Sequence, residues 1–549
     1  MSTFTVTNTN NSGAGSLRQG ILDANALSGK DIINFSGLFT DGLAHTISLN
    51  GSGLSITDNL TIEGRCPSLL TIKDDTADRV FDIGKGVTAA INGLTITNSY
   101  ENAVGGGAIS NEGVLTLSNS IITGNTVSYI TTGTYSYNKG GGIYNSGSLT
   151  VNYSIISGNS TNGDDGGGIY NSGSLTVNNT TISGNTATFG GGIKNDGSLT
   201  VNYSTINGNS AYDGNGILND GSLTVNHSTI SYNSNIYIYD SGAGGGIFNS
   251  GSLAVNYSTI SGNSAGEGGG GINNSGSLTV NYSTINGNSA GEDDGGGIFD
   301  DGSLTVNYST INGNSARKGG GIFGFRDGTP ILVSNSTIND NSVRDSYGSG
   351  GGIYSEISLS VSNSTISGNS VSNYFGEGGG IYITNTVTNT VNSPTTLSVS
   401  NSTISDNSVR GYYGEGGGIY NISMATVTNS TISGNEAHLG AGIYNEPYLY
   451  FSDGIKDTTL TVGNSTITHN KAFGIELNSG SYESGDGGGI YNYSPGTVTI
   501  DYSTIACNFD TPQEDSTKVI KSDDLVGKFI TKYDHNRIGN LNGSTFSYN

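Results

Sequence analysis

Two aspartates at equivalent positions of neighbouring sequence repeats have the types and spacing that could carry out chemistry. If the repeats stack regularly, the carboxyl groups of Asp196 and Asp220 lie about 5 Å apart, a separation typical of retaining glycosidases. Lys194 is near them in sequence. The alternative is that aspartate only replaces the serine of a turn, as Asp301 does beside Asp300.

A second acidic set precedes a glycine-flanked isoleucine that recurs along the chain. Stacked carboxylates repel one another, and Ca²⁺ bound by their oxygens would relieve that repulsion. Because the loops lack the spacing of a calcium β-roll, a solvated acidic edge is the other interpretation. The candidate metal ligands are Asp164, Asp165, Glu292, Asp293 and Asp294, and the set also includes Asp213, Glu267, Glu377, Glu415 and Asp486.

Three loops contain aromatic residues, NSVRDSYG, NSVSNYFGEG and NSVRGYYGEG, and the first and third also contain arginine. Aromatic faces with guanidinium groups beside them can stack on sugar rings and bind their hydroxyl or carboxylate groups. The loops could equally fold onto the protein or contact a neighbouring molecule. The candidate contact residues are Arg344, Tyr347, Tyr374, Phe375, Arg410, Tyr412 and Tyr413.

All these residues lie on a repeat that reads GGGIYN, SGSLTV and NYSTISGNSA, most often 24 to 26 residues long. Each segment is too short for a helix, is rich in Ile, Val, Thr and Tyr, and ends in Gly or Asn-Ser turns. We therefore expect three short strands per repeat. One repeat cannot bury its own inward face, but repeats stacked at about 4.8 Å form continuous rows. The sequence predicts an all-β fold, a right-handed parallel β-helix.

The stacking predicts which residues form the inward rows. Leucines 149, 175, 199 and 223 should form one apolar row, and glycines before the isoleucine should form corners with positive φ. An amide ladder is expected at a turn. Its asparagines are Asn159, Asn185, Asn209, Asn263, Asn288 and Asn314.

The two ends depart from the repeat, as capping units do. A helix is predicted between Ser16 and Ser28, with Ser16 and Gln19 spaced as a capping box. Its expected apolar face is Leu17, Ile21 and Leu22. We predict one continuous solenoid domain with an N-terminal cap and irregular coils over 1–125, regular repeats with loop insertions over 126–508, and a C-terminal cap over 509–549.

The segment Thr5–Asn25, TVTNTNNSGAGSLRQGILDAN, resembles the N-terminal signature of large bacterial surface β-helix proteins. Asn11 and Gly20 stand where that signature usually has aspartate and alanine. The GGGI and SGN repeats also resemble those of polymorphic outer-membrane proteins. The resemblance implies a pectate-lyase-like β-helix exposed outside a bacterial cell. It specifies the fold far better than the activity.

Charge and cysteine usage limit the partners. The net charge of −24 opposes nucleic acid and anionic membrane surfaces, and no stretch approaches the length of a membrane span. The start of the sequence has no signal-peptide pattern, so we expect export without a cleavable N-terminal signal. Cys66 and Cys507 lie near opposite ends of the sequence, so they are either buried thiols or an intermolecular disulfide of a head-to-tail fibre.

The uniform repeat favours a non-enzymatic extracellular scaffold, either an adhesin or the protomer of a fibre or coat. It requires no cofactor, although Ca²⁺ is a candidate ligand, and its expected partners are other copies of itself or surface glycans. The alternatives are a polysaccharide lyase or glycoside hydrolase using Asp196 and Asp220, and a glycan-binding module acting through the aromatic loops.

Overall fold

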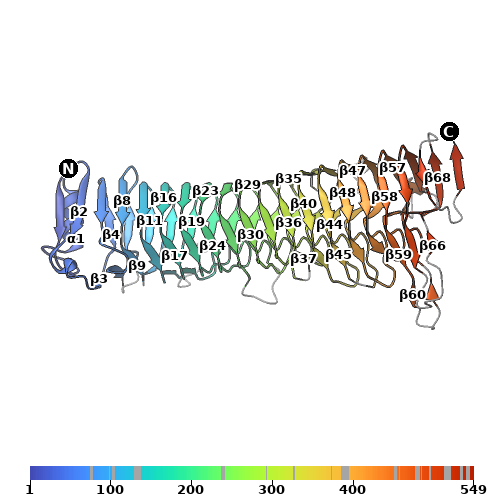
Figure 1. The fold of residues 1–549 in the computed structure, drawn as a ribbon. Coiled ribbons are helices and arrows are strands. Elements are labelled where there is room, and N and C mark those ends of the chain that lie inside the picture. The colour runs from blue at the N-terminus through green and yellow to red at the C-terminus, as the bar shows by residue number, and fades with distance from the viewer. Residues whose placement is uncertain are drawn as a thin grey trace. The chain divides into compact units, whose positions relative to one another are not determined.

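Each repeat forms one coil of a right-handed parallel β-helix, as a computed structural model of the protein shows (Figure 1). The structure describes residues 1–74, 78–97, 99–101, 105–128, 138–235, 242–291, 293–325, 328–372, 374–384, 395–450, 454–456, 458–476, 482–483, 485–493, 496–511, 521–522, 524–531, 536–539 and 545–548. The chain divides into unit 1, Met1–Ala265, and unit 2, Gly266–Asn549. The domain boundaries expected from the sequence remain a prediction.

Three parallel sheets run through unit 1. We name two of them after an inward residue of their strands, leucine or isoleucine, and the third after its outward threonine. The leucine sheet comprises β1 (Thr3–Val6), β2 (Asp31–Phe35), β5 (Leu60–Glu63), β8 (Thr88–Asn92), β12 (Val114–Ser118), β16 (Ser148–Asn152), β20 (Ser174–Asn178), β23 (Ser198–Asn202), β26 (Ser222–Asn226) and β29 (Ser252–Asn256). The threonine sheet comprises β3 (His45–Leu49), β6 (Leu70–Asp74), β9 (Thr95–Thr97), β13 (Ile121–Thr123), β17 (Ile155–Ser157), β21 (Thr181–Ser183), β24 (Thr205–Asn207), β27 (Thr229–Ser231) and β30 (Thr259–Ser261).

The isoleucine sheet of unit 1 carries the strand that follows the glycine run. It comprises β4 (Leu54–Ile56), β7 (Phe81–Ile83), β11 (Ile109–Asn111), β15 (Ile143–Asn145), β19 (Ile169–Asn171), β22 (Ile193–Asn195), β25 (Ile217–Asn219) and β28 (Ile247–Asn249). A short fourth sheet comprises β10 (Tyr100–Glu101), β14 (Thr126–Val127) and β18 (Ser160–Thr161).

Unit 2 repeats this arrangement. Its leucine sheet comprises β32 (Ser277–Asn281), β35 (Ser303–Asn307), β39 (Ile331–Ser334), β43 (Leu359–Ser362), β47 (Thr396–Ser400), β51 (Met424–Thr428), β57 (Thr459–Gly463), β63 (Thr497–Asp501), β68 (Lys528–Thr531) and β70 (Thr545–Tyr548). Its threonine sheet comprises β33 (Thr284–Asn286), β36 (Thr310–Asn312), β40 (Thr337–Asn339), β44 (Thr365–Ser367), β48 (Thr403–Ser405), β52 (Thr431–Ser433), β58 (Thr466–Thr468), β64 (Thr504–Ala506) and β69 (Arg537–Ile538).

The remaining strands of unit 2 form its isoleucine sheet, a fourth sheet and two hairpins. The isoleucine sheet comprises β31 (Ile272–Asn274), β34 (Ile298–Asp300), β38 (Ile322–Gly324), β42 (Ile353–Ser355), β46 (Ile381–Thr384), β50 (Ile419–Ile422), β54 (Ile443–Asn445), β62 (Ile490–Asn492) and β67 (Leu525–Val526). The fourth sheet comprises β37 (Ser315–Ala316), β41 (Ser342–Val343), β45 (Ser370–Val371), β49 (Ser408–Val409), β53 (Glu436–Ala437), β59 (Lys471–Phe473), β65 (Phe509–Thr511) and the antiparallel β66 (Lys521–Ser522). The hairpin β55–β56 (Tyr448–Tyr450, Gly454–Lys456) lies between β54 and β57, and the hairpin β60–β61 (Ile475–Glu476, Tyr482–Glu483) lies between β59 and β62.

The predicted leucine row is confirmed. Leu175 pairs with Leu149 on one neighbouring coil and with Leu199 on the other, and Leu199 pairs with Leu223. Each of these four side chains is 1% exposed. The alternation of the SLTVN strand places Leu and Val inward and Ser, Thr and Asn outward, because successive side chains of a strand point to opposite faces.

The glycine corners are also confirmed. Gly190 has φ +65°, in the left-handed region that favours glycine. At the next residue, a Cβ on Gly191 would lie 2.5 Å from the carbonyl oxygen of Ser210 on the following coil. The run before each isoleucine therefore needs glycine for two reasons, backbone conformation and close approach of the neighbouring coil.

The amide ladder lies inside the stack. Asn209 is 1% exposed, and its Oδ1 accepts from the backbone N and Nδ2 of Asn185 at 3.0 and 2.9 Å. Its Nδ2 donates to Ile182 O and to Asn233 Oδ1, both at 3.0 Å. The same pattern joins Asn288 to Asn314 in unit 2. The ladder satisfies buried polar groups at the turn, which would otherwise be costly.

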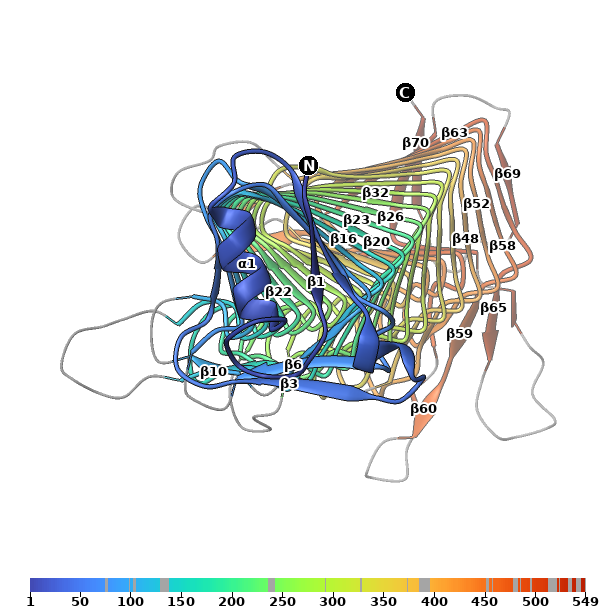
Figure 2. The same cartoon turned by 90° about the vertical axis from the view of Figure 1, so that its left-hand side faces the viewer.

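The one α-helix among the described residues, α1 (Leu17–Asn25), covers the first coil of unit 1, packing against β1, β2 and β4 (Figure 2). A short 3-10 helix, η1 (Gly37–Thr40), follows β2. Ser16 accepts from Gln19 N at 3.2 Å, but the Gln19 side chain donates to Asp23, so only half of the predicted capping box forms. The predicted apolar face was wrong at Leu22, which is 54% exposed. Buried residues are Leu17, Gly20, Ile21 and Ala24, because the helical period places i, i+3, i+4 and i+7 on one face.

No helix within the described ranges has the length and apolar character needed to cross a bilayer.

Replacing a ladder asparagine should destabilise the stack strongly. Asn209→Ala removes four hydrogen bonds and leaves the amide donors of Asn185 and the carbonyl of Ile182 without these partners in a buried site. We expect a loss of roughly 3 kcal/mol in the free energy of unfolding, measured by urea denaturation. Ser198→Ala, on the exposed side of β23, is the control and should change it by less than about 0.5 kcal/mol. Equal midpoints for the two variants would contradict this role of the ladder.

Candidate functional site

Three consecutive loops of unit 2 project beyond the fourth sheet and have the same length. They follow β41, β45 and β49 and return to the stack at Gly350, Gly378 and Gly416. Backbone hydrogen bonds join one loop to the next: Phe375 N donates to Ser346 O at 3.4 Å, and Tyr413 N donates to Tyr374 O at 3.0 Å. Because the loops are equal in length and hydrogen-bonded, equivalent residues of successive loops lie next to each other. We call them the aromatic loops.

The aromatic loops bring together the five aromatic residues predicted as a contact site. Tyr347, Phe375 and Tyr413 form one stacked column, with centroids 5.4 Å apart at both steps. Tyr374 and Tyr412 form a second column, at 5.0 Å. The columns meet edge to face, with interplanar angles of 71° to 73°. Such stacked and edge-to-face pairs are the favoured geometries of aromatic rings, so the loops hold one another in place.

Much of this aromatic cluster is open to solvent. Tyr347 is 71% exposed, Tyr374 44%, Phe375 40% and Tyr413 39%. An exposed apolar group of this kind, set in a strongly acidic chain, is typical of a contact surface. Tyrosine supplies a ring for packing and a hydroxyl for hydrogen bonding in the same side chain.

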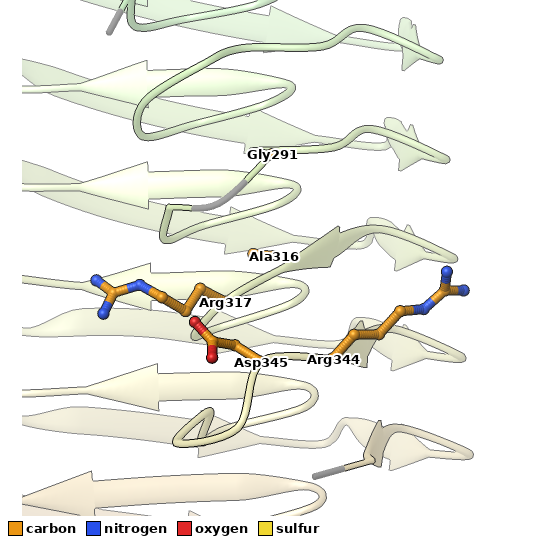
Figure 3. Close-up of a pocket in the computed structure, with 5 residues that line it drawn as sticks. All are labelled: Gly291, Ala316, Arg317, Arg344 and Asp345. Atoms are coloured by element: carbon orange, nitrogen blue, oxygen red, sulfur yellow. The ribbon is translucent and has the colours of Figure 1, made fainter. Parts of the chain in front are cut away.

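The two predicted arginines do not converge on one ligand. Arg410 approaches Glu436, with 3.9 Å between Nη2 and Oε2. Arg344 lines a cavity of about 470 Å³ with Gly291, Ala316, Arg317 and Asp345. Figure 3 shows that the side chains of Arg344 and Arg317 extend in opposite directions from this cavity. The cavity therefore presents no paired guanidinium groups to a carboxylate.

The aromatic loops end at a row of glutamates. Ser349, Glu377, Glu415 and Leu439 pair in parallel register across four coils. Beside this row, the outward tyrosines of β42, β46, β50 and β54 stack at 4.7 to 5.1 Å. These residues, Tyr354, Tyr382, Tyr420 and Tyr444, are 2% to 8% exposed, so an outward row is buried here.

The position of these carboxyl groups changes their titration. Burial raises the pKa of Glu377 to about 7, and Glu446 and Lys318 act on it in opposite directions. Burial, together with the nearby charges of Glu446 and Glu377, raises the pKa of Glu415 to about 8. Burial also raises the pKa of Glu446, which accepts a hydrogen bond from the Tyr420 hydroxyl. Perturbed groups of this kind gather at functional sites but also in structural networks.

Sequence reasoning placed Glu377 and Glu415 in the acidic set but did not associate them with the tyrosines. A recognisable signal is present, because a glutamate directly precedes the GGGIY motif in both repeats, as EGGGIY. What the pattern does not reveal is that residues such as Phe325, Ile422 and Leu439 pack against the outward tyrosine row.

The proposed calcium ligands occupy different surroundings. Asp293 and Asp294 face Arg317, at 3.6 and 3.3 Å, and burial raises the pKa of Asp294 to about 6. Asp164 accepts from the backbone N of Asn138 at 2.9 Å, and burial raises the pKa of Asp165. Glu292 lies outside the described residues. Among those described, no three His, Cys, Asp or Glu side chains are grouped as a metal site, and calcium binding stays a prediction.

The Asp196 and Asp220 pair of unit 1 is bridged by a lysine. Lys194 Nζ lies 3.1 Å from Asp196 and also donates to Asp220. Tyr170 donates to Asp196, and Ser250 donates to Asp220. Burial lowers the pKa of Lys194, but hydrogen bonds to the two carboxylates outweigh it and raise that pKa overall. The structure thus adds a charged bridge, whereas the retaining mechanism needs one protonated carboxyl group. Catalysis by this pair stays a prediction.

The surroundings of the two cysteines contradict the interpretation that both are buried thiols. Cys66 is half-buried with its sulfur 3.2 Å from Ser68 Oγ, and Cys507 is exposed, with φ +61°. Both being buried thiols is therefore wrong, because Cys507 occupies a corner that faces solvent. The intermolecular disulfide between Cys66 and Cys507 stays a prediction.

No protein family and no curated protein matches the sequence. Among solved structures, the chain is similar to a PL6 family alginate lyase, AlyGC, at 10% identity over 100% of this chain and 99% of that one, with a TM-score of 0.24. It is also similar to PfbA, a surface adhesin of Streptococcus pneumoniae, at 11% identity over 94% of this chain and 99% of that one, with a TM-score of 0.17. TM-scores this low support no statement about function.

The glutamate row should make unit 2 less stable as the pH rises. Glu377 and Glu415 titrate higher in the folded than in the unfolded chain, where glutamate has a pKa of about 4.3. The folded state therefore binds more protons, and stability falls as the pH rises from about 4.3 through 7 and 8. Urea denaturation at pH 5.5, 7 and 9 measures this.

Glu415→Gln is the test variant, since it keeps the shape and removes the charge. It should flatten the dependence near pH 8 and stabilise the protein at pH 9. Asp340→Asn changes an exposed carboxylate of the same unit and should keep the wild-type dependence. If Glu415→Gln also keeps it, the glutamate row is not the cause.

Proposed function

We propose that the protein is a non-enzymatic extracellular scaffold, structural or adhesive, that contacts glycans through its aromatic loops. The observation that carries the proposal is the pair of stacked, exposed aromatic columns on three loops of equal length. Elsewhere the repeat is uniform, and its outward positions are mainly Ser, Thr and Asn. A rigid stack that presents one distinct group of side chains suits contact rather than turnover.

The ligand class follows from the chemistry of the cluster. Sugar rings have apolar C–H faces and hydroxyl edges, which match aromatic faces and phenol hydroxyls. A protein partner would use the same side chains, since tyrosine is enriched at protein interfaces. We favour a glycan because the loops form a narrow double column rather than a broad apolar patch.

Alanine at either end of the column formed by Tyr347, Phe375 and Tyr413 should weaken glycan binding. Tyr347→Ala and Tyr413→Ala each remove a ring that stacks on Phe375, so we expect about a tenfold loss of affinity for each, corresponding to about 1.4 kcal/mol. A glycan array identifies the ligand, and calorimetry measures the affinity. Tyr493→Ala, 46% exposed in the same unit, is the control and should bind normally. Unchanged affinity in both loop variants would contradict the proposal.

A polysaccharide lyase or glycoside hydrolase is the second candidate function. It is favoured by Glu377 and Glu415, which lie on neighbouring coils beside the aromatic loops and have pKa values near neutrality. On this hypothesis Glu415→Gln abolishes the release of new chain ends from a polysaccharide panel. The original pair is tested in the same assay by Asp220→Asn. Release by the wild type that either variant abolishes would replace the scaffold proposal.

Assembly into a fibre or coat is part of the scaffold proposal. Negative-stain electron microscopy without reductant, in the presence of calcium, tests it. Filaments that reducing agent disperses would support the bond between Cys66 and Cys507. Separate particles under these conditions would exclude the fibre and leave the adhesive function.

A further inference from the structure

In the coils from β12 to β63, one corner holds its residue in the left-handed backbone region. This corner joins the leucine sheet to the threonine sheet, and its φ is +47° to +50° in most coils. Asparagine is the side chain that tolerates this conformation best after glycine, whereas bulky side chains are disfavoured. Asparagine does occupy the corner in many coils: Asn179 in unit 1, and Asn335, Asn363, Asn401, Asn429 and Asn464 in unit 2.

Aromatic residues occupy this corner in the other coils: Tyr153, Tyr203, His227 and Tyr257 in unit 1, and Tyr282, Tyr308 and Tyr502 in unit 2. Tyr203, His227 and Tyr257 have φ values of +50°, +48° and +50°. Their rings stack at 4.9 and 5.0 Å, within 3° and 7° of parallel. Tyr203 is 62% exposed, Tyr257 is 55% exposed, and His227 is exposed. We call these three residues the corner ladder.

Folding does not account for the corner ladder. The conformational cost of a bulky residue at this corner and the gain from stacking two rings are of the same order, so they nearly offset each other. Asparagine avoids the cost and can form its own ladder there, as Asn464 Nδ2 does with Asn429 Oδ1 at 2.7 Å. Folding of the coil therefore does not require aromatic residues at this corner.

The surfaces on either side of the corner ladder are uncharged. Strands β20, β23, β26 and β29 have the outward residues Ser, Thr or Ala, and Asn, and β21, β24, β27 and β30 have Thr followed by Ser or Asn. Beside the ladder, Asn202 and Asn226 belong to a second amide ladder with 2.9 Å hydrogen bonds. In a chain with a net charge of −24, these eight strands contain no charged residue.

We propose that the corner ladder and the uncharged strands beside it bind an extended, neutral polysaccharide. Hydroxyl and amide groups can exchange hydrogen bonds with sugar hydroxyls, while ring edges and phenol hydroxyls border the same surface. The groups repeat with every coil, about 4.8 Å apart, which is close to the length of one sugar residue in an extended chain. A polymer lying along the ladder would meet the same set of groups at each residue.

Charge selects the polymer. An anionic polysaccharide would be repelled by the acidic protein, and this surface offers no carboxylate to hold a cationic one. A second copy of this chain lying along this surface would bring the sides of two molecules of charge −24 together, unlike a fibre joined only at its ends, which disfavours it as the occupant. A neutral polymer is not repelled by the acidic protein and needs no carboxylate to hold it. This surface lies in unit 1 and does not depend on the aromatic loops of unit 2.

Asparagine, which other coils have at this corner, is the conservative substitution for the test. The variant combining Tyr203→Asn, His227→Asn and Tyr257→Asn introduces the residue that the same corner uses elsewhere, so it should fold, which circular dichroism and urea denaturation verify. Binding is measured by co-sedimentation with microcrystalline cellulose and with chitin. We expect the wild type to bind at least one of them and the triple variant to bind it at least tenfold more weakly.

Tyr232→Asn is the matched control, because Tyr232 is 71% exposed in the same unit with φ +54° but lies outside the corner ladder. It should bind like the wild type. Equal binding by the wild type and the triple variant, or no binding of either polymer by the wild type, would overturn the proposal. Sedimentation velocity showing a wild-type oligomer that the triple variant loses, without polymer binding, would overturn it in favour of a second copy.

Discussion

In-register parallel stacking of the coils is the constraint on which the rest of the structure depends. Every strand must pair with its equivalent on the next coil, so inward positions repeat the same residue types, as the leucine row does. The buried asparagines add side-chain bonds to the backbone pairing at each turn. The inward residues of each coil therefore stabilise the stack and are not available for binding. Specific contacts can arise only at outward positions and in loops, where substitution and insertion leave the pairing intact.

The same constraint determines how outward residues act together. Residues at one position of successive coils become neighbours, so a short motif repeated in sequence becomes a column in space. Three loops of equal length therefore form the aromatic columns, and two glutamates at one position form a half-buried row. Asp196 and Asp220 also become neighbours, but Lys194 on the same face lies between them and forms ion pairs with both. Repetition brings groups together, and the residues between them decide whether they remain available.

The fold and its inward rows could be predicted from the sequence because the repeat has a fixed period. The strands, the leucine row and the asparagine ladder follow from it, whereas the helix that begins after Ser16 was predicted from its capping residue and apolar spacing. The buried tyrosine row with its half-buried glutamates could not, since an outward tyrosine such as Tyr382 is buried only when residues of neighbouring coils and turns pack against it. The exposed Cys507 and the tyrosines with positive φ were missed for a related reason. Corner geometry depends on how strands of different sheets meet, which no alternation pattern encodes.

The central claim is that the stack is structural and that contacts are made where the repeat is interrupted by aromatic residues. Hydrogen–deuterium exchange, measured with and without a glycan identified by the array, tests it most directly. We expect added protection in the loops over 343–350, 371–378 and 409–416, and unchanged exchange in the peptides around Asp196 and Asp220. Protection around Asp196 and Asp220, with no change in the aromatic loops, would contradict the account.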